Sequence, residues 1–225
     1  MPDGLPSFSI PIQKSIVSSV STPNSPRPLM NHFQFSNDMD TLFEHIYQKL
    51  TAPDFGQNLG GELPLYIQPF PTKQQSAIPQ QVKHLMKRLE KKGITSIDIN
   101  LYDLCTDILQ EEGILDAILQ GEREISREDL VSTLDSVLDI KTVVIPRIQS
   151  LIEEQQPKFV FIHAIGRVYP FLRSHGILNN IDELTSDCNL VFFFPGEYNN
   201  LQLKLFGKIS DENYYRGQNL NDIMI

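Results

Sequence analysis

Phe159-Val-Phe-Ile162 and Leu190-Val-Phe-Phe-Phe194 are two short apolar runs, and each ends abruptly in polar sequence that contains glycine. The first continues through His163 to Gly166, and the second continues as Pro195-Gly-Glu-Tyr198. Because neither run alternates with polar residues and both are rich in Val, Ile or Phe, they are typical of strands buried on both faces of a sheet. Ligands of such sheets sit beside the loops that follow the carboxyl ends of the strands, so these polar continuations are the first place to look for a functional surface.

Strands and helices alternate along the rest of the chain. Further strands are predicted upstream at 63–70 and 94–99, and downstream near 201–207 and 213–219. Helices are predicted from the spacing of apolar residues over 39–50, 79–93, most of 101–156 and about 168–175. This order predicts an α/β fold of three layers, in which helices flank a mostly parallel sheet.

The first 36 residues differ from the remainder in composition. They hold six of the fifteen prolines, many serines and almost no charge, which is too little apolar surface to offset the entropy of ordering. We therefore predict a disordered extension over residues 1–36, or an upstream artefact if translation starts at Met30 or Met39. Residues 37–225 are predicted to form a single α/β domain.

Bulk composition limits the class of protein. Hydrophobic residues make up 40% of the chain, and no apolar run approaches the roughly 18 residues of a membrane helix. No basic start precedes an apolar core, so no secretory signal is predicted and the expected location is the cytoplasm, away from membranes. Cys105 and Cys188 are far apart in sequence and are predicted to be reduced thiols, with neither a metal nor a cofactor bound.

The loop after the first predicted strand argues against nucleotide hydrolysis. It reads Pro69-Phe-Pro-Thr-Lys-Gln-Gln-Ser76, which contains no glycine, and Lys73 lacks the flanking pattern of a phosphate-binding loop. Its prolines also remove backbone N–H groups that would bind phosphate. No GxGxxG follows a predicted strand. The fold is therefore expected to be P-loop- or Rossmann-like without a nucleotide-binding loop.

The segment Gly166-Arg-Val-Tyr-Pro-Phe-Leu-Arg-Ser-His175 allows two interpretations. In a catalytic one, Arg167 would bind an anion through its donor fork, His175 would be a general acid or base, and Glu197 would add a carboxylate at the same edge. In a structural one, Tyr169 packs the helix down while Arg173 and His175 oppose its dipole. Structure or partner binding is favoured over catalysis.

The segment after the second run is predicted to be a turn. Pro195 and Gly196 suit the two central positions of a type II turn, which would place Tyr198 over the sheet edge. His163 is expected to be a core or rim histidine. Asp98 and Asp103 would either meet as metal-binding aspartates or separate, with Asp103 capping the next helix.

A basic stripe marks the second predicted helix. Lys83, Lys87 and Lys91 share one face, with Arg88 nearby, and these residues would contact nucleic acid phosphates. A solvated helix face explains the stripe equally well, and the net charge of −9 opposes nonspecific attraction to nucleic acid.

Several longer motifs resemble the BrxB family, a component of the bacterial BREX systems that defend against bacteriophage. The resemblance covers about residues 38–218. It is carried by Glu62-Leu-Pro-Leu-Tyr-Ile67, Ile99-Asn-Leu-Tyr-Asp-Leu104, Gly166 to His175 with Leu178-Asn-Asn180, Phe193-Phe-Pro-Gly-Glu-Tyr198, Leu205-Phe-Gly207 and Asp211-Glu-Asn-Tyr-Tyr-Arg216.

The resemblance implies a small cytoplasmic protein encoded beside larger partners, among them a predicted phosphatase (PglZ), an ATPase (BrxC) and a methyltransferase (PglX). It carries no established catalytic residues onto this chain. The expected function is a non-catalytic adaptor whose loop edge docks a PglZ-type or BrxC-type protein, with DNA contacted at most indirectly. Candidate contact residues are those whose types anchor interfaces, Arg167, Tyr169, Arg173, His175, Glu197 and Tyr198. A nucleic-acid-contacting subunit and a cryptic hydrolase built around Arg167, His175 and Glu197 remain the alternatives.

Overall fold

The computed structural model describes residues 39–57, 62–121, 124–184, 188–199, 202–210 and 215–224. The predicted disordered extension and the alternative start at Met30 lie outside these ranges. The fold below is that of the compact unit Phe35–Ile225. None of the helices in the described segments is long and apolar enough to cross a membrane.

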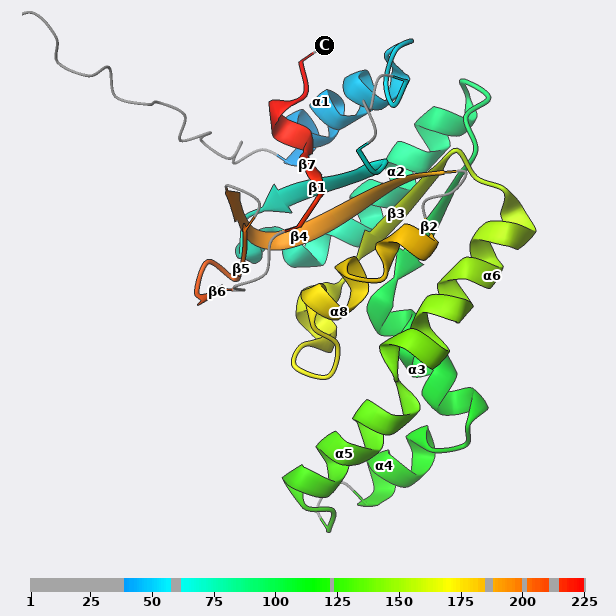
Figure 1. Ribbon diagram of the computed structural model, residues 1–225, viewed down its shortest axis with the longest axis vertical. Coiled ribbons are helices and arrows are strands. Elements are labelled where there is room, and N and C mark those ends of the chain that lie inside the picture. The colour runs from blue at the N-terminus through cyan, green and yellow to red at the C-terminus, as the bar shows by residue number, and fades with distance from the viewer. Residues whose placement is uncertain are drawn as a thin grey trace, which may run out of the picture. The chain divides into compact units, whose positions relative to one another are not determined.

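A mostly parallel sheet forms the centre of the fold (Figure 1). Its main path has the order β2-β3-β4-β1-β7, and every neighbouring pair along it is parallel. The strands are β1 (Leu65–Phe70), β2 (Ser96–Asn100), β3 (Phe159–His163), β4 (Asn189–Asn199) and β7 (Gln218–Asn219). The predicted three-layer α/β fold is therefore confirmed.

The apolar runs were predicted to be buried on both faces, and each face of the sheet has its own core. On one face Phe159, Phe161 and Phe193 pack with α1 (Met39–Thr51) and α2 (Ile78–Glu90). On the other face Val160, Ile162 and Phe192 pack with the helices between β2 and β4. Because successive side chains of a strand point to opposite faces, an uninterrupted apolar run supplies both cores at once.

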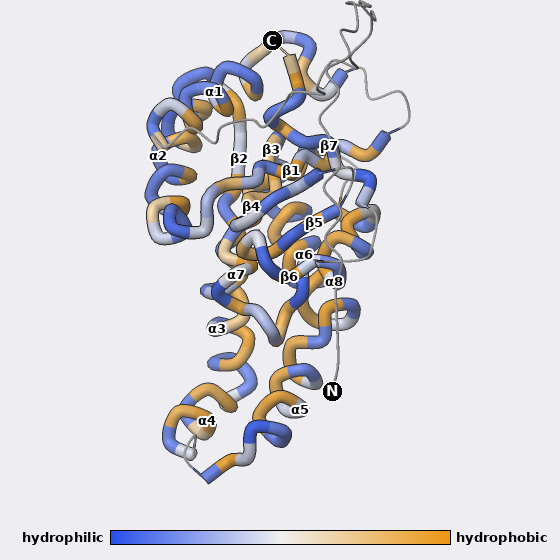
Figure 2. The backbone as a smooth tube through the Cα atoms, turned by 90° about the vertical axis from the view of Figure 1, so that its left-hand side faces the viewer, coloured by the Kyte–Doolittle hydropathy of each residue, from blue (hydrophilic) through white to orange (hydrophobic). Residues whose placement is uncertain are grey.

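In the described part of the connection from β2 to β3, the regular elements are all helices. It contains α3 (Leu101–Glu111), α4 (Leu115–Gly121), α5 (Arg127–Val137), the π-helical turn η2 (Ile140–Val144) and α6 (Ile145–Gln155). α3 and α6 contribute buried side chains to the core, whereas α4 and α5 lie away from the sheet in both views (Figures 1 and 2).

Between β3 and β4 the predicted single helix at about 168–175 is wrong. Two short helices are present instead, α7 (Ile165–Val168) and α8 (Ser174–Leu178), followed by the 3-10 turn η3 (Ile181–Glu183). The Tyr169–Pro170 peptide bond between α7 and α8 is cis. Pro170 has no N–H to donate, so a continuous helix through this position would lose a hydrogen bond.

The predicted turn at Pro195–Gly196 is also wrong, because β4 runs through both residues. The last part of β4 pairs antiparallel with β5 (Gln202–Leu205), which in turn pairs with β6 (Ile209–Ser210). At Gly196 φ is 153°, and a Cβ atom there would overlap the carbonyl oxygen of Lys204. Glycine therefore lets the β5 backbone approach closely enough to extend the strand.

Candidate functional site

The exits of β1, β3 and β4 converge around Gly166, as expected for parallel neighbours in one sheet. A Cβ atom on Gly166 would overlap Gln75 Oε1 and would lie 2.7 Å from a ring carbon of Phe206 and 3.0 Å from Cγ of Pro195. These three contacts come from the segment after β1, from the β5–β6 hairpin and from β4. β1 and β4 are neighbours in the sheet, and the chain leaves them in opposite directions. Folds of this kind usually bind ligands in the crevice at such a point. Here the side chains around Gly166 close that crevice.

The segment after β1 supports the prediction that a phosphate cradle is missing. Residues Thr72–Ala77 form the 3-10 helix η1, which leads directly into α2. The backbone N–H of Gln74 donates to the carbonyl of Pro71 at 2.9 Å, so it is used within the turn. The glycine-rich loop that would wrap a phosphate is replaced by a compact turn that begins after Pro71.

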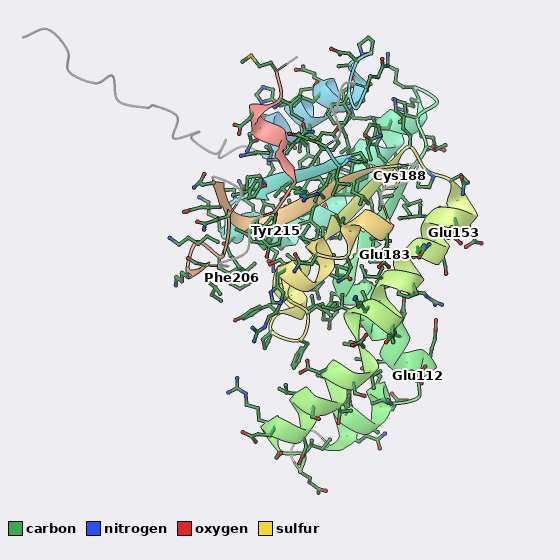
Figure 3. The ribbon with its side chains drawn as sticks, viewed as in Figure 1. Glu112, Glu153, Glu183, Cys188, Phe206 and Tyr215 are labelled. Carbon is green, nitrogen blue, oxygen red and sulfur yellow. The ribbon has the colours of Figure 1, made fainter. Side chains whose placement is uncertain are left out.

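The outer side of this closed crevice is aromatic and cationic. The guanidinium of Arg167 lies 3.8 Å from the ring centre of Tyr102, at the start of α3, and Tyr102 is 40% exposed. Tyr169 meets Phe206 edge to face, with ring centres 6.3 Å apart. Figure 3 shows Phe206 on the hairpin that follows β4. These contacts hold Arg167 and the aromatic rings in fixed positions before any partner arrives.

We call Tyr102, Arg167, Tyr169, Arg173 and Phe206 the edge surface. Arg173 is exposed and occupies the N-cap position of α8, and half-buried His175 lies in the first turn of that helix. The predicted role of Arg173 at a helix C-terminus is therefore wrong, whereas His175 also counts in the last turn of this five-residue helix. Tyr102 and Phe206 were not among the predicted site residues, although both lie within motifs that carry the family resemblance.

Tyr198 was expected to be an exposed interface anchor, but it is buried. Its side chain is 4% exposed, and its hydroxyl donates to the carbonyl of Gly217 at 2.6 Å. Burial raises the pKa of Tyr198 to about 12. The residue therefore ties the segment before β7 to β4 and presents little surface to a partner.

Two of the three residues of the hydrolase alternative, Arg167 and Glu197, contact different neighbours. Arg167 stacks on Tyr102, while the carboxylate of half-buried Glu197 lies near Gly207, beyond β5. In the register of the antiparallel strands β4 and β5, Glu197 lies opposite Lys204.

His163 and Asp98 form a buried polar pair on the sheet face that α1 and α2 cover. His163 is 1% exposed, and its Nε2 lies 2.7 Å from Oδ1 of Asp98. Nδ1 of His163 makes no hydrogen bond to the described residues. Asp103 separates from this pair and accepts a hydrogen bond from the Asn100 side chain, which caps α3. In the described part of the chain no cluster of three metal-ligating side chains is found.

The basic stripe on α2 is only partly available. Lys83, Lys87 and Lys91 are exposed. Arg88 instead ties α2 to α1, since it forms an ion pair with Glu44 at 2.8 Å and lies 3.7 Å from the ring centre of Tyr47.

Both cysteines are buried free thiols, as predicted. Cys188 Sγ donates to the carbonyl of Leu184 at 3.2 Å, and burial raises the pKa of the Cys105 thiol to about 12. A small cavity of about 70 Å³ borders Cys188 together with Glu153 and Glu183 (Figure 3). Because both thiols are buried, Cys105 and Cys188 are poorly suited to act as nucleophiles.

Comparison with known proteins gives one consistent result. The sequence model of the family described as "BREX protein BrxB" matches residues 97–220. A protein of that name from Bacillus cereus is 32% identical over 183 residues, which cover 80% of this chain and 95% of the relative. Another of the same name, from Escherichia coli, is 24% identical over 157 residues, covering 70% of this chain and 78% of the relative. No solved structure matches the chain significantly.

Proposed function

Because the chain belongs to the BrxB family of BREX proteins, we propose that it is a non-catalytic adaptor of a bacteriophage-defence complex in the cytoplasm. Its partners would be the larger proteins of the same system, a PglZ-type phosphatase or a BrxC-type ATPase. The edge surface would be the docking site.

The observation that carries this proposal is the closed crevice around Gly166. Gln75, Pro195 and Phe206 pack tightly around Gly166, at the edge where an α/β fold of this kind would admit a ligand. Outside it, Tyr102 and Arg167 present a stacked aromatic and guanidinium pair, and such residues anchor protein interfaces. A sheet edge that is tightly packed inside and carries aromatic side chains outside favours the docking of a protein over the binding of a small-molecule ligand.

The test measures the affinity of the purified chain for purified PglZ-type and BrxC-type proteins from the same system. The double variant Arg167→Ala with Arg173→Ala is expected to weaken binding of one of them by about tenfold or more. The variant Lys83→Ala with Lys87→Ala removes the same charge from α2 and should change binding by no more than about twofold. Equal effects of the two variants would contradict the assignment of the edge surface.

The α2 variant also tests the nucleic-acid alternative. If the lysine face contacts DNA, retention of DNA at low salt would disappear with Lys83→Ala and Lys87→Ala and would persist in the edge variant. DNA retention that neither variant changes would remove the basic helix from consideration.

A further inference from the structure

The net charge of the chain is concentrated in one segment. Residues 101–140 hold eleven of the 28 acidic residues and two of the 19 basic ones, so this segment alone carries a net charge of −9. The rest of the chain is balanced, with 17 residues of each sign. This segment contains α3, α4 and α5, and we call the part from 112 to 139 the acidic arm.

The acidic arm supplies two buried side chains to the core, Leu134 and Leu138, and its other apolar residues are at most half-buried. None of the side chains of α4 is buried, and Leu134 is the buried residue of α5. Leu119, in the middle of α4, is 63% exposed, which is high for a large apolar side chain. The arm therefore offers an apolar residue to solvent within a negatively charged surrounding.

Some carboxylates of this segment are used inside the fold. Asp129 pairs with Ser126 at the start of α5, and Asp139 accepts from the backbone N–H of Thr142. Glu111, at the end of α3, forms an ion pair with Arg147. These three residues have structural reasons to be acidic.

The remaining carboxylates that the structure describes in the arm make no such contact, although Asp116 and Glu128 lie in the first turns of α4 and α5, where a negative charge is favourable. Glu112, Asp116, Glu128 and Asp135 are exposed, and we find no hydrogen bond or ion pair to them among the described residues. Figure 3 shows Glu112 at the start of the arm, where α3 ends.

Two of these free carboxylates lie where a negative charge is unfavourable. Glu112 is the C-cap residue of α3, and Asp135 is in the last turn of α5. The C-terminus of a helix carries partial negative charge, so an acidic residue there destabilises it slightly. The last turns of α3, α4, α5 and α6 contain no basic residue, whereas that of α2 contains Lys87 and Arg88. A cause outside helix stability is needed to explain why these positions are acidic.

We propose that the acidic arm is a second docking site, which binds a partner protein whose surface carries Lys and Arg around a shallow apolar pocket for Leu119. Opposite charges steer and orient such an encounter, and the buried leucine supplies the apolar contact. The proposal rests on the adaptor function and extends it, since two separate docking surfaces would allow the chain to bridge two proteins.

Two other occupants fit the arm less well. Nucleic acid phosphates are repelled by the arm, whose eight acidic and two basic residues give it a net charge of −6. A second copy of the chain offers the lysine face of α2, but the exposed large apolar side chains among the described residues are Tyr102, Leu119, Ile209 and Met224, none of which lies on α2. The lysine face therefore has no matching apolar contact for Leu119.

The experiment compares three full-length variants against the PglZ-type and BrxC-type proteins. The arm variant carries Glu112→Gln, Leu119→Ser and Asp135→Asn. The matched variant carries Asp54→Asn and Glu154→Gln, which change charge equally at exposed positions outside the arm. The edge variant is Arg167→Ala with Arg173→Ala. Circular dichroism and thermal unfolding confirm that each variant folds.

The arm variant is expected to bind one partner about tenfold or more weakly, and the matched variant should stay within about twofold of the unmodified chain. Affinity for that partner should also fall as salt rises from about 0.05 to 0.5 M, and less steeply in the arm variant. Carbodiimide coupling, which joins carboxylates directly to amines, should link Glu112 or Asp135 to lysines of the partner.

Each contrary outcome has its own meaning. If the edge variant loses binding and the arm variant does not, the adaptor function stands and the second docking site is wrong. If the unmodified chain binds neither protein, both proposals fall. If the arm variant changes only self-association, measured by light scattering, the occupant is a second copy and the proposal is overturned.

Discussion

The helices that cover the sheet differ from those of the acidic arm in how well their sequences suit their own stability. α1 and α2 bury apolar stripes against Phe161 and Phe193, and both have basic residues in the last turn, where they oppose the helix dipole. α4 and α5 fully bury a single side chain, Leu134, and their last turns contain no basic residue. The difference teaches that helix stability explains the charges at the ends of α1 and α2, whereas it does not explain the acidic residue at the end of α5.

The largest expected effect is on the free energy of unfolding, and it compares a buried residue of the sheet with an exposed residue of the arm. Phe193 is fully buried and stacks on Phe43, with ring centres 5.5 Å apart. Phe193→Ala should lower the free energy of unfolding by about 3–5 kcal/mol, because it removes a large apolar contact and leaves a cavity. Urea denaturation measures the change. Leu119→Ala in α4 is the matched truncation and should cost no more than about 0.5 kcal/mol. Similar costs at both positions would show that the arm is buried in solution.

The fully buried strands are the part of this architecture that the sequence predicts best. Phe159–Ile162 and Leu190–Phe194 are continuous apolar runs, and a strand covered on both faces has no other pattern available. The end of β4 was missed, because its continuation through Gly196 depends on antiparallel pairing with β5, which local turn preferences do not report. The same pairing places Tyr198 inside the fold instead of at the surface.

Contacts between residues that lie far apart in the sequence were the other feature that the sequence could not predict. Arg167 was predicted as a site residue, but its stacking partner Tyr102 lies 65 positions earlier and meets it only because α3 and α7 follow neighbouring parallel strands. The pair of His163 with Asp98 has the same origin, since the register of β2 against β3 sets which residues face each other. Without that register, a metal site formed by Asp98 and Asp103 and a helix cap formed by Asp103 were equally consistent with the sequence.

A second prediction concerns this polar pair inside the covered sheet. His163→Ala should lower the free energy of unfolding by about 2–4 kcal/mol, because it opens space in the core and leaves Asp98 without its partner. Asp98→Asn keeps an oxygen acceptor for Nε2 and should cost about 1 kcal/mol. Chemical denaturation of both variants gives the comparison. If His163→Ala costs no more than Asp98→Asn, the pair is not a determinant of stability.

A third prediction uses the buried phenol of Tyr198. Its pKa is raised from 10.0 to about 12 by burial, so the folded protein holds this proton more tightly than the unfolded chain. Stability is therefore complete below pH 10 and falls as pH rises toward 12, as the unfolded phenol ionises first. Tyr66 and Cys105 are shifted in the same direction and add to the loss.

Tyr198→Phe tests this assignment. The variant loses the hydrogen bond to Gly217 and should be about 1 kcal/mol less stable at pH 7. Its stability should also decline less steeply between pH 10 and 12, which denaturant titrations at several pH values would show. An unchanged alkaline slope would mean that the Tyr198 phenol ionises equally in both states.

The smallest predicted effect has the opposite sign and tests the arm most directly. Asp135→Asn removes a negative charge from the last turn of α5, so it should raise the free energy of unfolding by a few tenths of a kcal/mol. Asp129→Asn is the matched control in the same helix. Asp129 lies in the first turn, where its charge is favourable and its carboxylate accepts from Ser126 at 2.8 Å, so this variant should lower stability. Thermal unfolding of the two variants gives the signs. Opposite signs would show that the arm keeps an acidic residue at the expense of its own helix, whereas destabilisation by both would assign Asp135 a structural role and weaken the case for a docking site.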